Sequence, residues 1–258
     1  MNAKLTTLSL ATMLIAAPAL AVELIGQVES KNRQSVVAEV NGVVESANFE
    51  PGDKVDQNAL LANIKTQNFD FELSKKQAGL ELAQADLHLK QTTFERFQEL
   101  VRKNSLSAND LDTAKAEYLN AKANLQLAEI ELEQARQNLD DTKVTSTMGG
   151  FIVSRSAEEG AWVNQGDLLY QLVNIDTVTI KLLASEYDMT SLNVGQAIEV
   201  WSETEPSKKI QSVVKRIGVE MDANAHAYPI EVEINNHDYS LKPGMSIYAS
   251  TDITESNQ

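Results

Sequence analysis

Two runs of seven-residue repeats, separated by a short polar segment, restrict what this chain can fold into more than any other part of its sequence. In the second run, bulky residues and alanines each recur every seven positions: Leu111, Tyr118, Leu125, Leu132 and Leu139, with Ala114, Ala121, Ala128 and Ala135. The first run has a matching set: Leu73, Leu80, Leu87, Phe94 and Val101, joined by Ala83 and Phe97. Because such a seam packs one helix against another, the pattern predicts a long antiparallel α-helical coiled-coil hairpin over residues 66–141.

The segment between the two runs has the chemistry of a tight turn between helices. Arg102 and Lys103 place cations at the negative end of the first helix. Asn104 tolerates the left-handed backbone that closes a helix, and Ser107 with Asp110 predicts a capping box for the second helix. Each predicted helix is about 35 residues, or about 50 Å, long at ~1.5 Å per residue. We therefore interpret the hairpin as a spacer or a reaching arm.

The composition argues against several classes of function. The chain has 258 residues, a net charge of −15 and a pI near 4.6, which disfavours a nucleic acid partner. It has no cysteine, which excludes disulfides, thiolate metal sites, a cysteine nucleophile and a lipid attached through Cys. Its histidines, His88, His226 and His237, lack metal-ligand spacing. With no acid/base pair and no phosphate-binding loop recognisable, we expect no enzymatic activity, no cofactor and no metal site.

The first 21 residues have the pattern of a secretory signal peptide. Lys4 supplies the positive start, an apolar run follows, and Ala19-Leu20-Ala21 fits the cleavage rule for small residues. Cleavage would leave Val22 at the mature N-terminus. The alternative is an uncleaved membrane anchor, but the apolar run is short compared with the ~20 residues of a spanning helix. We therefore expect an exported protein.

The segments that flank the predicted hairpin repeat one another. Before it lie Gly42-Val43-Val44, Pro51-Gly52-Asp53-Lys54-Val55 and Leu60-Leu61; after it lie Gly150-Phe151-Ile152, Glu159-Gly160-Ala161-Trp162-Val163 and Leu168-Leu169. The two glycines are ten positions apart in both copies, and valine and leucine are five apart in both. A repeat split by an insertion predicts a small β-sandwich made of residues 36–65 and 142–175.

The remaining sequence predicts a second β unit. Alternating apolar residues mark two strands, Val178, Ile180 and Leu182 in one and Ile230, Val232 and Ile234 in the other. A short helix is expected over residues 186–192, and the turn Leu241-Lys242-Pro243-Gly244-Met245 leads into a last strand. Several antiparallel strands predict a barrel of residues 22–35 and 176–258. The fold class is thus mixed α and β and elongated, with the hairpin nested in the sandwich and the sandwich nested in the barrel.

This nested order resembles the periplasmic adaptor proteins of Gram-negative tripartite efflux pumps, the HlyD-like membrane fusion proteins. The sandwich halves resemble split lipoyl/biotinyl domains, and Leu241-Lys242-Pro243-Gly244-Met245 resembles the closing signature of the family's barrel. Arg96, Leu100 and Ser107 have the spacing of the family's hairpin-tip motif, which is associated with docking a TolC-type channel. Here Thr147 replaces a usual proline and Asn58 replaces a turn glycine. The family's membrane-proximal domain is expected to be missing or vestigial.

The resemblance implies a non-catalytic periplasmic adaptor. Its implied partners are an inner-membrane transporter of the RND class and an outer-membrane TolC-type channel, and it would assemble into a ring, with six as the candidate number of subunits. The alternatives are an adaptor of an ABC or MFS exporter and a free-standing exported coiled-coil or lipoyl-like protein. A lipoyl carrier is disfavoured, because the hairpin interrupts the place where a carrier lysine would stand.

Two groups of residues are the candidate contact sites. The tip residues Arg96, Leu100 and Ser107 are predicted to dock the channel; alternatively they are a solvated charge, a residue closing the coil and a helix cap. Apolar residues off the main seam are predicted to pack hairpins side by side: Leu82, Leu89, Leu119 and Ile130, with Ala78, Ala85, Ala116, Ala123 and Leu127 beside them. Exposed apolar stripes usually mark a contact, although single apolar residues are also tolerated on helix surfaces.

Overall fold

A computed structural model describes residues 22–253, so the predicted signal peptide lies outside the described residues. The chain divides into two compact units, one built from two segments far apart in the sequence and the other from one continuous segment. Among the described residues, one unit contains residues 22–31 and 175–253, and the other contains Asn32–Asn174. Two long strands, β1 (Glu23–Val37) and β8 (Leu168–Ala184), continue from one unit into the other. The three-domain division proposed from the sequence stays a prediction.

The first unit is the predicted barrel. Its strands pair in the order β1, β12 (Ser246–Ser250), β9 (Ala197–Ser202), β10 (Ile210–Ile217), β11 (Tyr228–Asn235) and β8, and β8 also pairs with β1. The inward positions of each strand are apolar and form the core: Leu24, Val28, Val178, Ile180, Leu182, Ile198, Val200, Ile230, Val232, Ile247 and Ala249. The apolar residues that alternate along each strand in the sequence are therefore the buried ones, as expected for strands with one buried face.

The turn at residues 241–245 ties the last strand to the first. Gly244 has a φ of 92°, a backbone conformation that glycine adopts without steric strain. Its N–H donates to the Val28 carbonyl at 2.8 Å, and the Val28 N–H donates to the Met245 carbonyl at 2.9 Å. The predicted short helix over residues 186–192 is wrong in extent. Only a 3₁₀ turn, η1 (Asp188–Thr190), forms there, because Asp188 and Ser185 bond each other's backbone N–H groups.

The two copies of the sequence repeat complete each other in the second unit. One sheet has the order β5 (Lys143–Thr145), β4 (Leu60–Ile64), β2 (Gly42–Ala47) and β7 (Trp162–Val163); elsewhere β3 (Lys54–Val55) pairs with β6 (Gly150–Arg155), which pairs with β8. Thus β2 of the first copy pairs with β7 of the second, and β6 of the second copy pairs with β3 of the first. Both sheets cover one core that includes Val44, Leu61, Ile64, Val55, Ile152 and Leu172.

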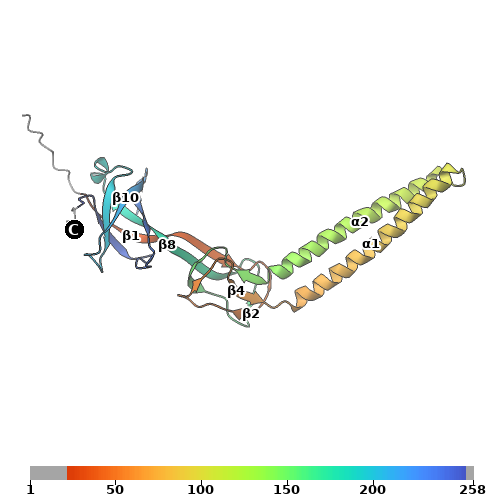
Figure 1. Cartoon of the computed structure of the whole chain (residues 1–258), viewed down its shortest axis with the longest axis horizontal. Helices are drawn as coiled ribbons and strands as arrows, with labels where there is room; N and C mark the ends of the chain where they lie inside the picture. The colour runs from red at the N-terminus through yellow and green to blue at the C-terminus, as the bar shows by residue number, and fades with distance from the viewer. Residues whose placement is uncertain (1–21, 254–258) are drawn as a thin grey trace, which may run out of the picture. The chain divides into compact units, whose positions relative to one another are not determined.

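The hairpin consists of α1 (Gln67–Arg102) and α2 (Ala108–Asp140), which run side by side (Figure 1). The predicted seam is the contact between them: Ala114, Ala121, Leu132 and Ala135 are buried, and the apolar seam residues of α1 are half-buried. Phe94 and Tyr118 stack across the seam with ring centroids 5.7 Å apart. Within residues 22–253, no helix combines the length and apolar composition that a membrane span requires.

Candidate docking sites on the helical hairpin

The hairpin tip presents one arginine that the fold does not use. Arg96 lies on the last turns of α1 and is exposed. Within the described part of the chain, its guanidinium group has only a long hydrogen bond, 3.4 Å to the Thr93 hydroxyl. Arg102, by contrast, is held by Glu99 at 2.9 Å and by Gln98 at 3.4 Å. Most N–H donors of Arg96 therefore remain available, and a planar guanidinium group is well suited to carbonyls or carboxylates on another protein.

The other two predicted tip residues shape the turn. Leu100 is half-buried, one helical turn after Arg96, and its carbonyl accepts the Ser105 N–H at 2.8 Å. Ser107 caps α2: its hydroxyl accepts the Asp110 N–H at 3.2 Å and donates to the Asp110 carboxylate at 2.7 Å. Asn104, with a φ of 55°, makes the left-handed turn that its sequence predicts. These contacts establish structural roles for Leu100 and Ser107, while docking by the three residues stays a prediction.

All four residues predicted to pack hairpins together are exposed. Leu82, Leu89, Leu119 and Ile130 have exposed fractions between 52% and 73%. Because Leu82, Leu89 and Arg96 are seven positions apart, they follow one face of α1 that leads to the tip. Exposed apolar residues that gather on one surface often mark a contact, so this surface is a candidate contact with another protein. The packing of hairpins through these residues stays a prediction.

Leu82 and Leu127 border a hollow between the two helices. A space of about 490 Å³ is lined by Gly79, Leu82, Ala83, Leu127 and Ala128, together with polar residues at its ends. One end is closed by the ion pair of Lys76 with Glu131 at 3.0 Å, whose hydrogen bond raises the pKa of Lys76. A Cβ atom at Gly79 would meet no atom within 4 Å. The packing of the hairpin therefore does not require glycine here, and the missing side chain enlarges the hollow.

Sequence reasoning missed two exposed aromatic side chains in this unit. Phe71 is 65% exposed near the start of α1, seven positions before Ala78 of the predicted stripe, and this spacing could have revealed it. Trp162 is 64% exposed on β7 and borders a hollow of about 330 Å³ with the half-buried Phe69. Trp162 points outward from a strand of two residues. Such a strand is too short for alternation in the sequence to predict which side chain faces solvent.

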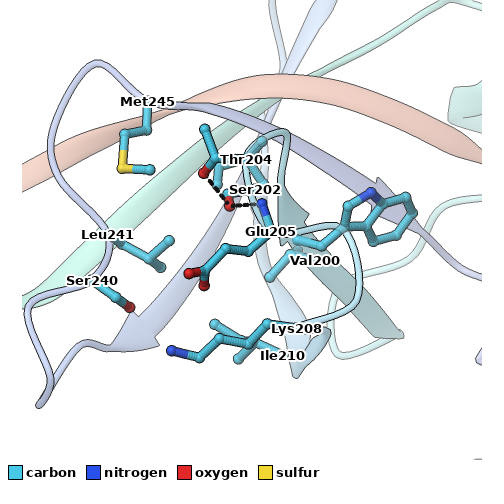
Figure 2. A pocket seen from close by; sticks show the side chains of 11 residues that line it. Val200, Ser202, Thr204, Glu205, Lys208, Ile210, Ser240, Leu241 and Met245 are labelled. Atoms are coloured by element: carbon cyan, nitrogen blue, oxygen red, sulfur yellow. Dashed lines mark hydrogen bonds between the residues drawn. The ribbon is translucent and has the colours of Figure 1, made fainter.

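A small cavity beside β9 in the barrel unit is too small to be a comparable site. Figure 2 shows its lining, with Met245 and Leu241 on one side and the hydrogen-bonded Ser202, Thr204 and Glu205 on another. Its volume is about 90 Å³, whereas small-molecule pockets usually measure about 300–1,000 Å³. Among residues 22–253, no three His, Asp or Glu side chains are placed to hold a metal ion together.

Comparison with known protein families assigns the chain to a family. A family model described as "RND MFP, alpha-helical hairpin domain" matches residues 72–142, and one described as "CusB-like, beta-barrel domain" matches residues 177–254. Together the two matches take in more than half of the chain, and they fall on the hairpin and the barrel. The chain belongs to the membrane fusion protein family.

Individual relatives agree with this assignment. The "Multidrug resistance protein MdtA" of Pectobacterium carotovorum is 26% identical to this membrane fusion protein over 86% of the chain and 56% of the relative. The protein of the same name from Escherichia coli O7:K1 is 24% identical over 87% and 56% of the two chains. This chain therefore spans about half the length of the curated relatives it matches.

Solved structures share the fold. The crystal structure of MacA from Actinobacillus actinomycetemcomitans is 26% identical, with a TM-score of 0.74, over 89% of this chain and 77% of that chain. The crystal structure of ZneB from Cupriavidus metallidurans, at 22% identity and a TM-score of 0.58, matches 89% of this chain and 97% of its own and shows likeness of fold alone. The predicted combination of hairpin and barrel is thus the fold of this family.

Proposed function

We propose that this membrane fusion protein is a non-catalytic periplasmic adaptor that joins an inner-membrane efflux transporter of the RND class to a TolC-type outer-membrane channel. The observation that carries the proposal is Arg96, an exposed guanidinium group near the end of a long two-helix arm, with a single long hydrogen bond and no ion pair among the described residues. The match of the arm to a hairpin of RND membrane fusion proteins supports the transporter class. The similarity to multidrug resistance proteins supports efflux as the process.

Photo-crosslinking in intact cells tests which partner each end of the adaptor contacts. A photoreactive amino acid at Leu100 should capture an outer-membrane channel, and one at the exposed Val219 of the barrel unit should capture an inner-membrane transporter. The same label at Gln84, an exposed polar residue midway along α1, serves as the control for random capture. Mass spectrometry of the products identifies the transporter class. Capture of no channel from Leu100, or of the same partners from Leu100 and Gln84, would refute the proposed arrangement.

We further propose that copies of the adaptor assemble into a ring through the exposed apolar residues of the hairpin. Leu82→Glu or Leu119→Glu should weaken assembly, because each places a charge in the proposed apolar contact. The stability of the monomer should change by no more than about 0.5 kcal/mol, as is usual for exposed positions. Gln84→Glu adds the same charge on a polar position of α1 and should leave assembly intact. If both leucine variants match wild type in light scattering and in export activity, these residues take no part in assembly.

A further inference from the structure

An open groove on the barrel unit combines apolar and acidic side chains. It measures about 690 Å³ and lies over β1, β8 and the loop of residues 222–227. Because side chains alternate along a strand, Glu23, Ile25, Gln27 and Glu29 all face outward from β1. This puts an apolar residue between carboxylates on one face. The volume is within the usual range for a pocket that holds a small molecule.

The floor of the groove contains two aliphatic side chains, from two strands that approach closely there. Gly26 lies against the backbone of Lys181 and Leu182, where a Cβ atom on residue 26 would collide with the Lys181 carbonyl. The close approach places Ile25 of β1 and Leu183 of β8 in the same groove, and their exposed fractions are 57% and 37%. Two exposed aliphatic side chains in a concavity gain free energy when an apolar group covers them.

The rim of the groove is negatively charged. It carries four carboxylates, Glu23, Glu29, Asp188 and Asp222, and one cation, Lys181, whose ammonium group lies 3.9 Å from Asp222. In the part of the chain that the structure describes, the carboxylates of Glu23 and Glu29 have neither an ion pair nor a hydrogen bond. Their charges are therefore available to a ligand, and the groove attracts cations more strongly than anions.

The loop that forms one wall is held in place by its own hydrogen bonds. The Asp222 carboxylate accepts the N–H groups of Asn224 at 2.9 Å and Ala225 at 3.1 Å, and these bonds lower the pKa of Asp222. The Asp222 N–H donates to the Ala227 carbonyl at 2.9 Å, and the His226 N–H donates to the Asp222 carbonyl at 2.8 Å. The wall is thus formed before a ligand arrives, which lowers the entropy cost of binding.

We propose that this groove binds amphiphilic organic monocations, with the apolar body over Ile25 and Leu183 and the positive charge attracted by the carboxylates of the rim. A bulky compact cation matches a groove of this volume. A basic peptide is the alternative occupant, and the experiment below separates the two. Binding here is a property of the barrel unit of the single chain, so it is measurable whether or not the protein acts as an adaptor.

Equilibrium dialysis with two ions of equal shape and opposite charge tests the proposal. The protein should bind tetraphenylphosphonium saturably, and it should bind tetraphenylborate at least tenfold more weakly. Because ionic attraction at the rim is screened by salt, tetraphenylphosphonium should bind less tightly at 0.5 M than at 0.05 M NaCl. Equal binding of both ions would show that only apolar attraction operates. Binding of a lysine-rich peptide without binding of tetraphenylphosphonium would assign the groove to a protein partner instead.

Variants locate the binding in this groove. Glu23→Gln with Glu29→Gln removes both unpaired charges with little change of shape and should weaken tetraphenylphosphonium binding about fivefold or more. Leu183→Arg fills the floor with a cation and should abolish binding. Val213→Arg makes the same kind of change on β10, where Val213 is 46% exposed and outside the groove, and should bind like wild type. Wild-type affinity in both groove variants, or equal loss in Val213→Arg, would overturn the proposal.

Discussion

Arg96→Asp is expected to abolish recruitment of the outer-membrane channel while the protein still folds, is exported and binds its transporter. Reversing a charge in a desolvated contact typically costs about 2–5 kcal/mol, equivalent to a loss of affinity of about 30-fold to several thousand-fold. Inside the hairpin the same change removes only a 3.4 Å hydrogen bond to Thr93. The fold should therefore lose no more than about 0.5 kcal/mol. Crosslinking to the channel and export of a substrate are the two measurements.

Charge reversal elsewhere on the hairpin is the matched control for Arg96→Asp. Arg136 is also exposed, on α2 far along the sequence from the tip, with a loose ion pair to Glu133 at 3.7 Å. Arg136→Asp should leave recruitment of the channel unchanged. Leu100→Ala and Ser107→Arg alter the shape of the same tip, but Ser107 is the less specific probe because loss of a helix cap alone costs about 1 kcal/mol. Wild-type crosslinking and export in Arg96→Asp would remove the support for docking at the tip.

Asn236→Ala is expected to lower the free energy of unfolding of the barrel unit by about 3 kcal/mol or more. The Asn236 side chain is 2% exposed and satisfies three backbone groups. It donates to the carbonyls of Ile175 at 2.9 Å and Leu241 at 2.8 Å, and it accepts the Leu241 N–H at 3.0 Å. Alanine would remove all three hydrogen bonds, and each buried group that loses its partner costs about 1–3 kcal/mol.

Urea unfolding monitored by the fluorescence of Trp201 measures this loss. Trp201 belongs to β9 of the barrel unit, so a Trp162→Phe background makes the signal specific to that unit. Asn235→Ala is the control in the adjacent position: Asn235 is exposed, and its side chain makes one long hydrogen bond of 3.5 Å to Thr177. We expect a clearly lower midpoint for Asn236→Ala than for Asn235→Ala. Equal midpoints in the two variants would contradict the role assigned to Asn236.

The hairpin and its turn were predictable because their signals are local. A helix places residues three and four apart on one face. The spacing of Leu111, Ala114 and Tyr118 therefore predicts which face of the helix is buried. The cap at Ser107 and the left-handed residue Asn104 likewise depend on neighbours within a few positions. The extent of η1 was mispredicted because side-chain bonds between Ser185 and Asp188 close one tight turn there, which helical periodicity does not register.

The sequence by itself determined the order of elements, the seam of the hairpin and the presence of a split repeat. The first two are visible in the periodicity of apolar residues, and the repeat is visible in the equal spacing of matching residues. Only the tertiary structure decided which strands of the repeat pair with each other and that Asn236 is buried. It likewise decided that Gly26 brings β1 against β8 to create a groove. The physical reason is that these features depend on close approach between segments up to about 150 positions apart, such as Gly26 and Lys181. A residue's own neighbours in the chain carry no signal of such an approach.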